Sequence, residues 1–193
     1  MPRSDGTPTA SQRLLSPRRF ITRDEAEEAV EHARDLVRLG GAVFRAAPAL
    51  LKTGEWAVNW GTGASGYWFP EDWDRTTPGD ETALTRWRYG DALGFVTGHA
   101  FDVLDVDPRN GGDRDLAEVE RLQLMPTVYA RAATPSGGEH LFIAATGTRK
   151  TKRGGLDLQA GVEGEGHGFV FIAPTVRKSK VDGQIRPYLW DIS

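Results

Sequence analysis

The pattern of hydrophobic and polar positions divides the chain into stretches with different periods. Over Ala26–Val37 the apolar residues recur every three or four positions, which predicts a helix that ends at Gly40 and Gly41. Thr22 and Glu25 stand in the spacing of a capping box and predict where this helix begins. In the second half of the chain most apolar runs are short and bounded by Gly, Pro or Asp, which is typical of strands.

The predicted elements follow the order helix, strand, helix, strands, helix, strands. The expected strands are Ala42–Ala46, Leu93–Thr97, Phe101–Val106, Thr127–Ala133, Glu139–Ala144, Gly155–Gln159, Phe169–Ala173 and Pro187–Trp190. Two more helices are expected, one from Thr77 to Arg88 and one that Asp113 caps. Leu93–Thr97 and Phe101–Val106 flank a Gly-His turn, so we expect them to be antiparallel neighbours. This order predicts an α+β fold with a mostly antiparallel or mixed sheet.

Composition indicates an ordinary globular protein. The chain has 193 residues, of which 39% are hydrophobic and 26% charged. We expect a single domain over residues 21–193, preceded by a flexible basic arm, residues 1–20, that is rich in Pro, Ser, Thr and Arg. No apolar run has transmembrane length and the N-terminus lacks the apolar core of a signal peptide, so we expect a cytoplasmic protein.

The residue types present restrict any metal site to oxygen ligands. Cysteine is absent, and the four histidines lie too far apart in the sequence for a local zinc motif. Oxygen ligands favour Mg²⁺ or Mn²⁺. The net charge of −3 argues against a nonspecific nucleic-acid binder, which usually carries a basic excess.

Carboxylates interrupt two strands that are otherwise apolar. Asp105 and Asp107, in FDVLDVDPRNGG, are expected on one strand face within roughly 7 Å, where they repel unless a cation lies between them or water screens them. Asp102 points to the other face and is expected to be solvated. Asp157 interrupts the strand in GGLDLQAG, where a lone buried carboxylate needs a partner. The three acids Asp105, Asp107 and Asp157 suit a site for two divalent ions, and solvated strand ends are the alternative interpretation.

The stretch ATPSGGEHLFI joins two expected strands through a tight turn. Gly137 and Gly138 let backbone amides approach a phosphate, and Ser136 and His140 lie beside them in the sequence. A plain hairpin turn, followed by a histidine with an internal partner, is the alternative.

Basic residues gather on both sides of the strand that carries Asp157. They are Arg149, Lys150, Lys152 and Arg153 before it, Arg177, Lys178 and Lys180 after the next strand, and Arg13, Arg18 and Arg19 in the arm. Clusters that line one groove can bind phosphate in spite of the negative net charge, because binding depends on the local potential. Solvated loops are the alternative.

Six short blocks of sequence occur in a specific order. They are GFVTG (Gly94–Gly98), VLDVDPRNGG (Val103–Gly112), TPSGGEHLF (Thr134–Phe142), GLDLQ (Gly155–Gln159), GFVFIAPTV (Gly168–Val176) and YLW (Tyr188–Trp190). With these blocks the chain resembles the bifunctional DNA primase/polymerase (prim-pol) domains of the archaeo-eukaryotic primase superfamily, which occur in replication proteins of plasmids and phages. The resemblance implies an RRM-like catalytic sheet joined to an N-terminal α/β unit. Gln159 departs from the family, which often has arginine there.

The same resemblance implies a function. Asp105, Asp107 and Asp157 correspond to the catalytic, metal-binding acids, and His140 to the nucleotide-binding histidine. The expected activity is template-dependent nucleotidyl transfer from (d)NTPs on single-stranded DNA, with two Mg²⁺ or Mn²⁺ ions. Relatives usually continue into a helical accessory region and a helicase, which are the expected partners of a monomeric enzyme without membrane contacts.

Two other functions are open on the residues alone. One is a non-catalytic single-stranded nucleic-acid-binding module of a replication initiator, which would use the basic clusters and the tryptophans as stacking platforms. The three carboxylates favour the enzyme, because a pure binder gains nothing from negative charge where phosphates approach. The other is a sugar transferase with a D-x-D motif, but the nucleotide-binding α/β half that it needs is not evident.

Overall fold

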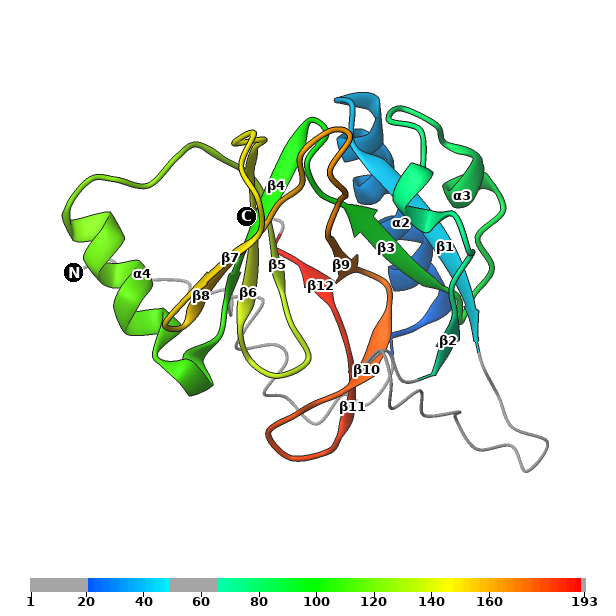
Figure 1. Ribbon diagram of the computed structural model, residues 1–193. Helices are drawn as coiled ribbons and strands as arrows, with labels where there is room; N and C mark the ends of the chain where they lie inside the picture. Colours follow the sequence, from blue (N-terminus) through cyan, green and yellow to red (C-terminus); the bar gives the residue numbers. More distant parts are fainter. Residues whose placement is uncertain (1–20, 49–65, 192–193) are drawn as a thin grey trace, which may run out of the picture.

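The computed structural model describes residues 21–48 and 66–191, and strands outnumber helices in this part of the chain (Figure 1). The strands are β1 (Ala42–Pro48), β2 (Tyr67–Trp68), β3 (Ala92–Val96), β4 (Phe101–Val106), β5 (Val128–Ala133), β6 (Glu139–Ala144), β7 (Thr151–Arg153), β8 (Leu156–Gln159), β9 (Phe169–Ile172), β10 (Val176–Lys178), β11 (Ile185–Pro187) and β12 (Leu189–Trp190). The helices are α2 (Arg23–Arg38), α3 (Thr82–Thr85) and α4 (Gly112–Arg121), with 3₁₀ turns η1 (Trp73–Arg75) and η2 (Pro108–Asn110). The α+β class is confirmed.

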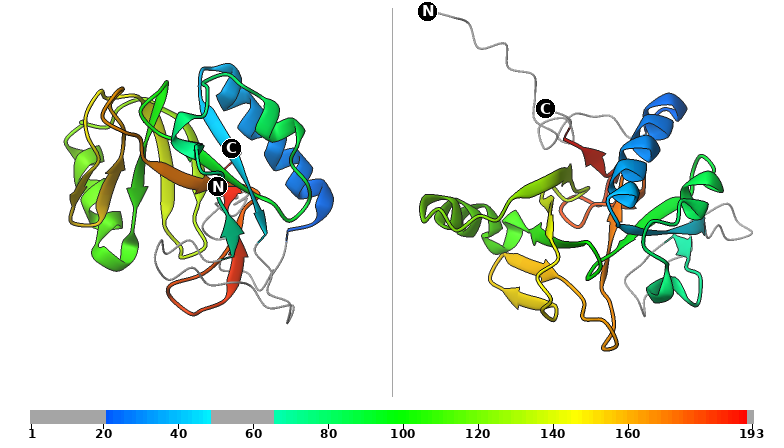
Figure 2. Two further views of the ribbon diagram at one scale, coloured as in Figure 1. Left: turned by 45° about the vertical axis from the view of Figure 1, so that its right-hand side comes forward. Right: turned by 90° about the horizontal axis from the view of Figure 1, so that it is seen from above.

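The strands form a four-stranded sheet in the order β2-β1-β3-β9, a six-stranded sheet in the order β12-β5-β6-β4-β8-β7, and the β10–β11 hairpin. Every strand pairing in the described ranges is antiparallel, so the sheets are antiparallel and not mixed. Helix α4 packs beside β4 and β8, on the side of the molecule away from α2 (Figures 1 and 2). No helix among the described residues is long and apolar enough to cross a membrane.

The first helix forms as its sequence predicts. Thr22 Oγ1 accepts a hydrogen bond from the Glu25 amide (3.3 Å), and Glu25 Oε2 accepts one from the Thr22 amide (2.9 Å), which completes the capping box. The buried face of α2 joins the core between the sheets. Trp190 of β12 donates from Nε1 to the carbonyl of Ala29 (2.9 Å), so the six-stranded sheet is bonded directly to this helix.

The expected pairing of Leu93–Thr97 with Phe101–Val106 is wrong. Strand β3 pairs with β1 and β9, and β4 pairs with β6 and β8, so each already has a neighbour on both edges. The turn between them therefore carries the chain from one sheet to the other. Gly98 adopts φ +91° there and lies so close to Gly161, on the return crossing from β8 to β9, that a Cβ atom would meet the Gly161 backbone at 2.5 Å.

The helix expected from Thr77 to Arg88 is reduced to the single turn α3, Thr82–Thr85. Gly79 takes a left-handed conformation (φ +78°) and donates its amide to the carbonyl of Gly41 (2.9 Å), which no helix starting at Thr77 can accommodate. Helix α4 begins one residue before Asp113, which lies in its first turn while Gly111 is the N-cap. The arm, residues 1–20, lies outside the described residues.

Asp102 is buried, contrary to the expectation that it is solvated. Its side chain is 0% exposed. Oδ2 accepts hydrogen bonds from the amide and the hydroxyl of Thr146, each at 2.7 Å. Asp102 therefore fixes the chain that follows β6 against the middle of the six-stranded sheet.

We expect Asp102→Ala to lower the free energy of unfolding by about 1 kcal/mol, because the amide and the hydroxyl of Thr146 both lose their acceptor in a part-buried position. Asp102→Asn keeps one acceptor oxygen and should cost less. Urea unfolding of both variants provides the measurement. An Asp102→Ala protein as stable as the wild type would mean that this carboxylate contributes nothing to the fold.

Candidate active site

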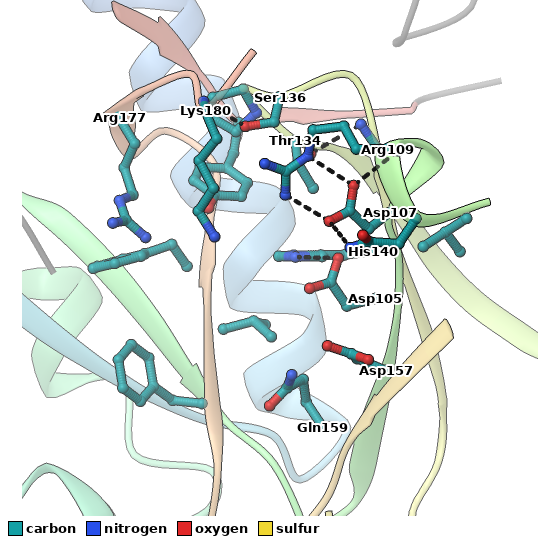
Figure 3. Close-up of a pocket in the computed structure, with 18 of the residues that line it drawn as sticks. Asp105, Asp107, Arg109, Thr134, Ser136, His140, Asp157, Gln159, Arg177 and Lys180 are labelled. Carbon is teal, nitrogen blue, oxygen red and sulfur yellow. Dashed lines mark hydrogen bonds and ion pairs between the residues drawn. The ribbon is translucent and has the colours of Figure 1, made fainter. Parts of the chain in front are cut away.

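A polar cavity of about 500 Å³ lies between the six-stranded sheet and the segment that runs from β9 to β11 (Figure 3). It brings together most of the residues that the sequence singles out. Those that line it are Asp105, Asp107, Ser136, Gly138, His140, Lys150, Lys152, Asp157, Arg177, Lys178 and Lys180. Gly137, Arg149 and Arg153 are not among its lining residues. Acidic groups on the sheet and basic groups around them thus face a common space.

Three of these residues form a row across adjacent strands. His140 on β6 is the direct partner of Asp105 on β4, and Asp105 is in turn the partner of Asp157 on β8. Directly opposite residues of antiparallel strands point to the same face of the sheet. The register of three strands therefore places the imidazole and both carboxylates side by side, although they are up to 52 positions apart in the chain (157 − 105).

Asp105 and His140 share a desolvated environment. Burial raises the pKa of Asp105, an effect that His140 opposes and the nearby Asp157 adds to. Burial also lowers the pKa of His140, with Asp105 opposing. His140 Nε2 lies 3.6 Å from Asp105 Oδ1, which is too long for a strong hydrogen bond. At neutral pH the imidazole is therefore uncharged beside this carboxylate.

Asp107 lies in a very different environment, just beyond the end of β4. Its carboxylate caps η2 and is held by Arg109 in a bidentate ion pair, with Nε–Oδ1 at 2.9 Å and Nη2–Oδ2 at 2.5 Å. The hydrogen bond from Arg109 is the main reason why the pKa of Asp107 lies below its usual value. Two acids of one D-x-D motif are thus shifted in opposite directions.

Asp157 has one satisfied and one unsatisfied oxygen. Oδ2 pairs with Lys152 Nζ (3.1 Å), whereas Oδ1 is buried and has no hydrogen-bond partner among the described residues. A buried carboxylate oxygen without a donor is costly and suits a cation as its partner. The acid types and this free oxygen fit a divalent ion. Over residues 21–48 and 66–191, however, no three His, Asp or Glu side chains are assembled closely enough to hold one.

The turn after β5 is tightly bonded within itself. The amides of Gly137 and Gly138 donate to the carbonyl and the Oγ1 of Thr134, at 3.0 and 3.1 Å. Both amides expected to cradle a phosphate therefore already have acceptors. A Cβ at Gly138 would meet the Val106 carbonyl at 2.2 Å, so glycine is required where this turn approaches the end of β4. Ser136 accepts a hydrogen bond from the Lys180 amide (3.0 Å), which joins the turn to the β10–β11 hairpin.

The basic residues are not equivalent. Arg149 pairs with Glu165 (2.7 Å) and Lys152 with Asp157, whereas Lys150 and Lys178 form no ion pair within the part of the chain that the structure describes. The guanidinium of Arg177 lies 4.8 Å from the centroid of the Phe171 ring, in a cation–π contact. Figure 3 shows the side chain of Lys180 pointing into the pocket.

Sequence reasoning missed three residues of this site. Arg109 and Thr134 line the pocket, and so does Tyr188, whose ring packs on His140 with centroids 5.5 Å apart. Burial raises the pKa of Tyr188 to about 12, so its hydroxyl stays protonated. Arg109 follows Asp107 by two positions in a Pro-Arg-Asn-Gly turn, which was a usable signal for a side chain that folds back. Gln159, the departure from the expected arginine, is buried and lines the pocket.

A comparison with protein families gives a match that covers most of the chain. The family model described as bifunctional DNA primase/polymerase, N-terminal, matches residues 32–191. This segment includes every pocket residue named above. A search of curated proteins finds no match.

The opposite environments of Asp105 and Asp107 predict opposite effects on stability. Because the pKa of Asp105 is raised, its ionised form costs folding free energy at neutral pH, and the cost disappears as acid protonates it. We expect Asp105→Asn to raise the free energy of unfolding by up to about 1 kcal/mol at pH 7 and by less at pH 4. Asp107→Asn should lower it by less than about 1 kcal/mol at both pH values, since Arg109 holds the pKa of this carboxyl below its usual value and the ion pair lies near the surface.

Urea unfolding of the two single variants at pH 7 and pH 4 measures these effects. Shifts of the same sign at pH 7 would contradict the assignment of different environments to the two acids.

Proposed function

Because the chain belongs to the bifunctional DNA primase/polymerase N-terminal domain family, we propose that it is a template-dependent nucleotidyltransferase that makes DNA primers or extends them from (d)NTPs. We place it in replication of the plasmid or phage type. The observation that carries the proposal is the row His140–Asp105–Asp157, which faces a cavity whose other walls are basic. The strand order β8-β4-β6-β5, with α4 between β4 and β5, supports the RRM-like sheet of an archaeo-eukaryotic primase.

Asp105, Asp107 and Asp157 are the residues that would hold two divalent ions, Mg²⁺ or Mn²⁺. Such ions, when bound, would activate a 3′-hydroxyl and neutralise the pyrophosphate leaving group. The burial of Asp105 and the free Oδ1 of Asp157 support this assignment, since both carboxylates lack a strong internal donor at those atoms. Phosphoryl transfer of this type needs no nucleophilic side chain, only groups that position the substrates.

The nucleotide's triphosphate would lie between the turn after β5 and the β10–β11 hairpin. Ser136 presents its hydroxyl there, and His140 lies below it as a neutral imidazole that packs against the ring of Tyr188. Lys180 and Arg177 approach from the hairpin and would neutralise phosphate charge (Figure 3). The amides of Gly137 and Gly138 contribute by shaping the turn, because they already donate to Thr134.

Template DNA would follow the basic residues at the two rims of the cavity. Lys150, after β6, and Lys178, on β10, line the cavity, and neither forms an ion pair in the described ranges. They would compensate locally for the negative net charge of the chain.

A non-catalytic single-stranded nucleic-acid-binding module is the second candidate. Its support is the exposed side chain of Trp68 (69%), on which a base could stack, and the pairing of Asp107 and Asp157 with internal cations. Trp73, Trp87 and Trp190 pack against the core and cannot serve in this way. Such a module would bind DNA but would synthesise none.

Primer extension and de novo synthesis on single-stranded DNA, with Mg²⁺ and Mn²⁺ compared, test the enzymatic function. We expect the wild type to incorporate nucleotides and Asp157→Asn to lower the rate by on the order of a hundredfold or more, because charge stabilisation at the reacting atoms is lost. Asp113→Asn, on α4 and outside the pocket, is the matched control and should retain the wild-type rate. DNA binding without any incorporation by the wild type would favour the binding module.

The salt dependence of DNA binding tests the template path. Each lost phosphate contact should flatten the log–log salt slope for single strands by about 0.7, so Lys150→Ser with Lys178→Ser should flatten it by about 1.4. Arg121→Ser, whose arginine pairs with Glu118 on α4, is the control and should leave the slope unchanged. Fluorescence anisotropy over a salt series measures both. An unchanged slope in the double variant would place the template elsewhere.

A further inference from the structure

Arg109 and Asn110 together occupy the carboxylate of Asp107 completely. The turn η2 reverses the chain directly after β4, so a side chain two positions after Asp107 returns to it. Besides the two guanidinium contacts, the backbone amide of Arg109 donates to Oδ1 (3.1 Å), and Asn110 Nδ2 donates to Oδ2 (2.9 Å). A carboxylate offers about four acceptor sites, and all four are in use here.

A divalent ion can therefore bind Asp107 only after one of these donors leaves. The amide of Arg109 belongs to the turn itself, and Asn110 is held next to it. The guanidinium is at the end of a long side chain that is 36% exposed, so it can move without unfolding the turn. Arg109 is thus the donor that an incoming ion would displace.

The other two acids of the site are not blocked in this way. Asp157 Oδ1 has no partner among the described residues, and Asp105 Oδ1 faces only His140 at 3.6 Å. In the described part of the chain the three carboxylates are not assembled into one group, and Asp107 is the one whose oxygens are both bound by internal donors. Asp105 and Asp157 each have an oxygen available to a divalent ion, whereas the oxygens of Asp107 are occupied.

The released guanidinium would remain beside the place proposed for the triphosphate. Arg109 lines the same cavity as Ser136 and Lys180, and Figure 3 shows it between Asp107 and the turn that carries Thr134 and Ser136. A guanidinium that has bound a carboxylate in a bidentate geometry is equally suited to two oxygens of a phosphate.

We propose that Arg109 is a positioning residue that occupies Asp107 until a divalent ion enters, and that then transfers its guanidinium to the polyphosphate of the nucleotide. This inference rests on the proposed function, which places the ions at the three acids. Ion binding and nucleotide binding would then favour each other. The ion takes the place of Arg109 at Asp107, and the nucleotide provides the released guanidinium with a new partner. Thermodynamic linkage requires that the ion raise the affinity for the nucleotide by the same factor as the nucleotide raises the affinity for the ion.

Mn²⁺ binding to the nucleotide-free protein tests the first half. Electron paramagnetic resonance of free Mn²⁺ would be followed in titrations of the wild type, Arg109→Gln and Arg114→Gln. Arg114 is the matched control, since it is exposed, pairs only with Asp115 at 3.4 Å and lies outside the pocket. We expect Arg109→Gln to bind Mn²⁺ about three- to fivefold more tightly, the range of a near-surface ion pair, and Arg114→Gln to bind it like the wild type.

Binding of a non-hydrolysable nucleoside triphosphate at saturating Mn²⁺, measured by calorimetry, tests the second half. Arg109→Gln should bind it about three- to fivefold more weakly, and Arg109→Lys, which keeps the charge but loses the bidentate geometry, should fall in between. Thermal unfolding of each variant establishes that the turn is intact. Unchanged or weaker Mn²⁺ binding in Arg109→Gln overturns the proposal, and so does unchanged nucleotide binding.

These readouts need no DNA synthesis, so the two hypotheses fail separately. A wild type that shows the expected Mn²⁺ and nucleotide effects of Arg109 but extends no primer overturns the polymerase function and supports the role of Arg109. An Asp107→Asn protein that binds Mn²⁺ as tightly as the wild type overturns the role of Arg109, because Asp107 would then be no ligand, and it leaves the primer-extension test of the polymerase function unaffected.

Discussion

The register of β4 against its two neighbours is the constraint on which the site depends. Asp105 faces His140 on one side and Asp157 on the other only because both pairings are in this register. A slip of one residue in either strand would turn a site residue to the opposite face. The same register places Val103 opposite Phe142, which is fully buried against Phe95 and Trp190. An apolar pair two positions along the strand therefore fixes the alignment of the polar pair.

One face of the six-stranded sheet thus serves two purposes along the length of β4. Its first half closes the core between the two sheets, and its second half opens into the cavity. On the opposite face, Val106 and Leu141 pack against Leu116 of α4. Asp105 and Asp157 therefore lie on strands of a sheet that is packed on both faces, and Asp107 alone lies at the start of the short η2 turn, where the chain would adjust.

The sequence predicted those elements whose signals lie within a few neighbouring residues. The capping box of α2 and the bounds of β4 and β6 were confirmed, since side-chain spacing alone determines them. The sequence also singled out Asp105, His140 and Asp157, which the fold brings together. It could not reveal which strands are neighbours, because the partners of β3 and β4 are chosen by contacts more than 30 positions away along the chain, such as Leu104 with Leu141 (141 − 104 = 37). Arg109 and Asp102 escaped prediction for a related reason, since their partners are set by a turn and by the chain beyond β6.

The paired crossings at Gly98 and Gly161 have a consequence for how such domains can diverge. The four-stranded sheet takes β1, β2 and β3 from the first half of the chain but its edge strand β9 from the second, and β12 returns to contact α2. Neither sheet is therefore formed by one continuous segment of the chain. A recombination event that replaced only the residues before Gly98 would bring in a β3 edge and an α2 surface that had never packed against the resident β9 and Trp190. The two sheets must be inherited together, and sequence drift in one is limited by what the other can still accommodate.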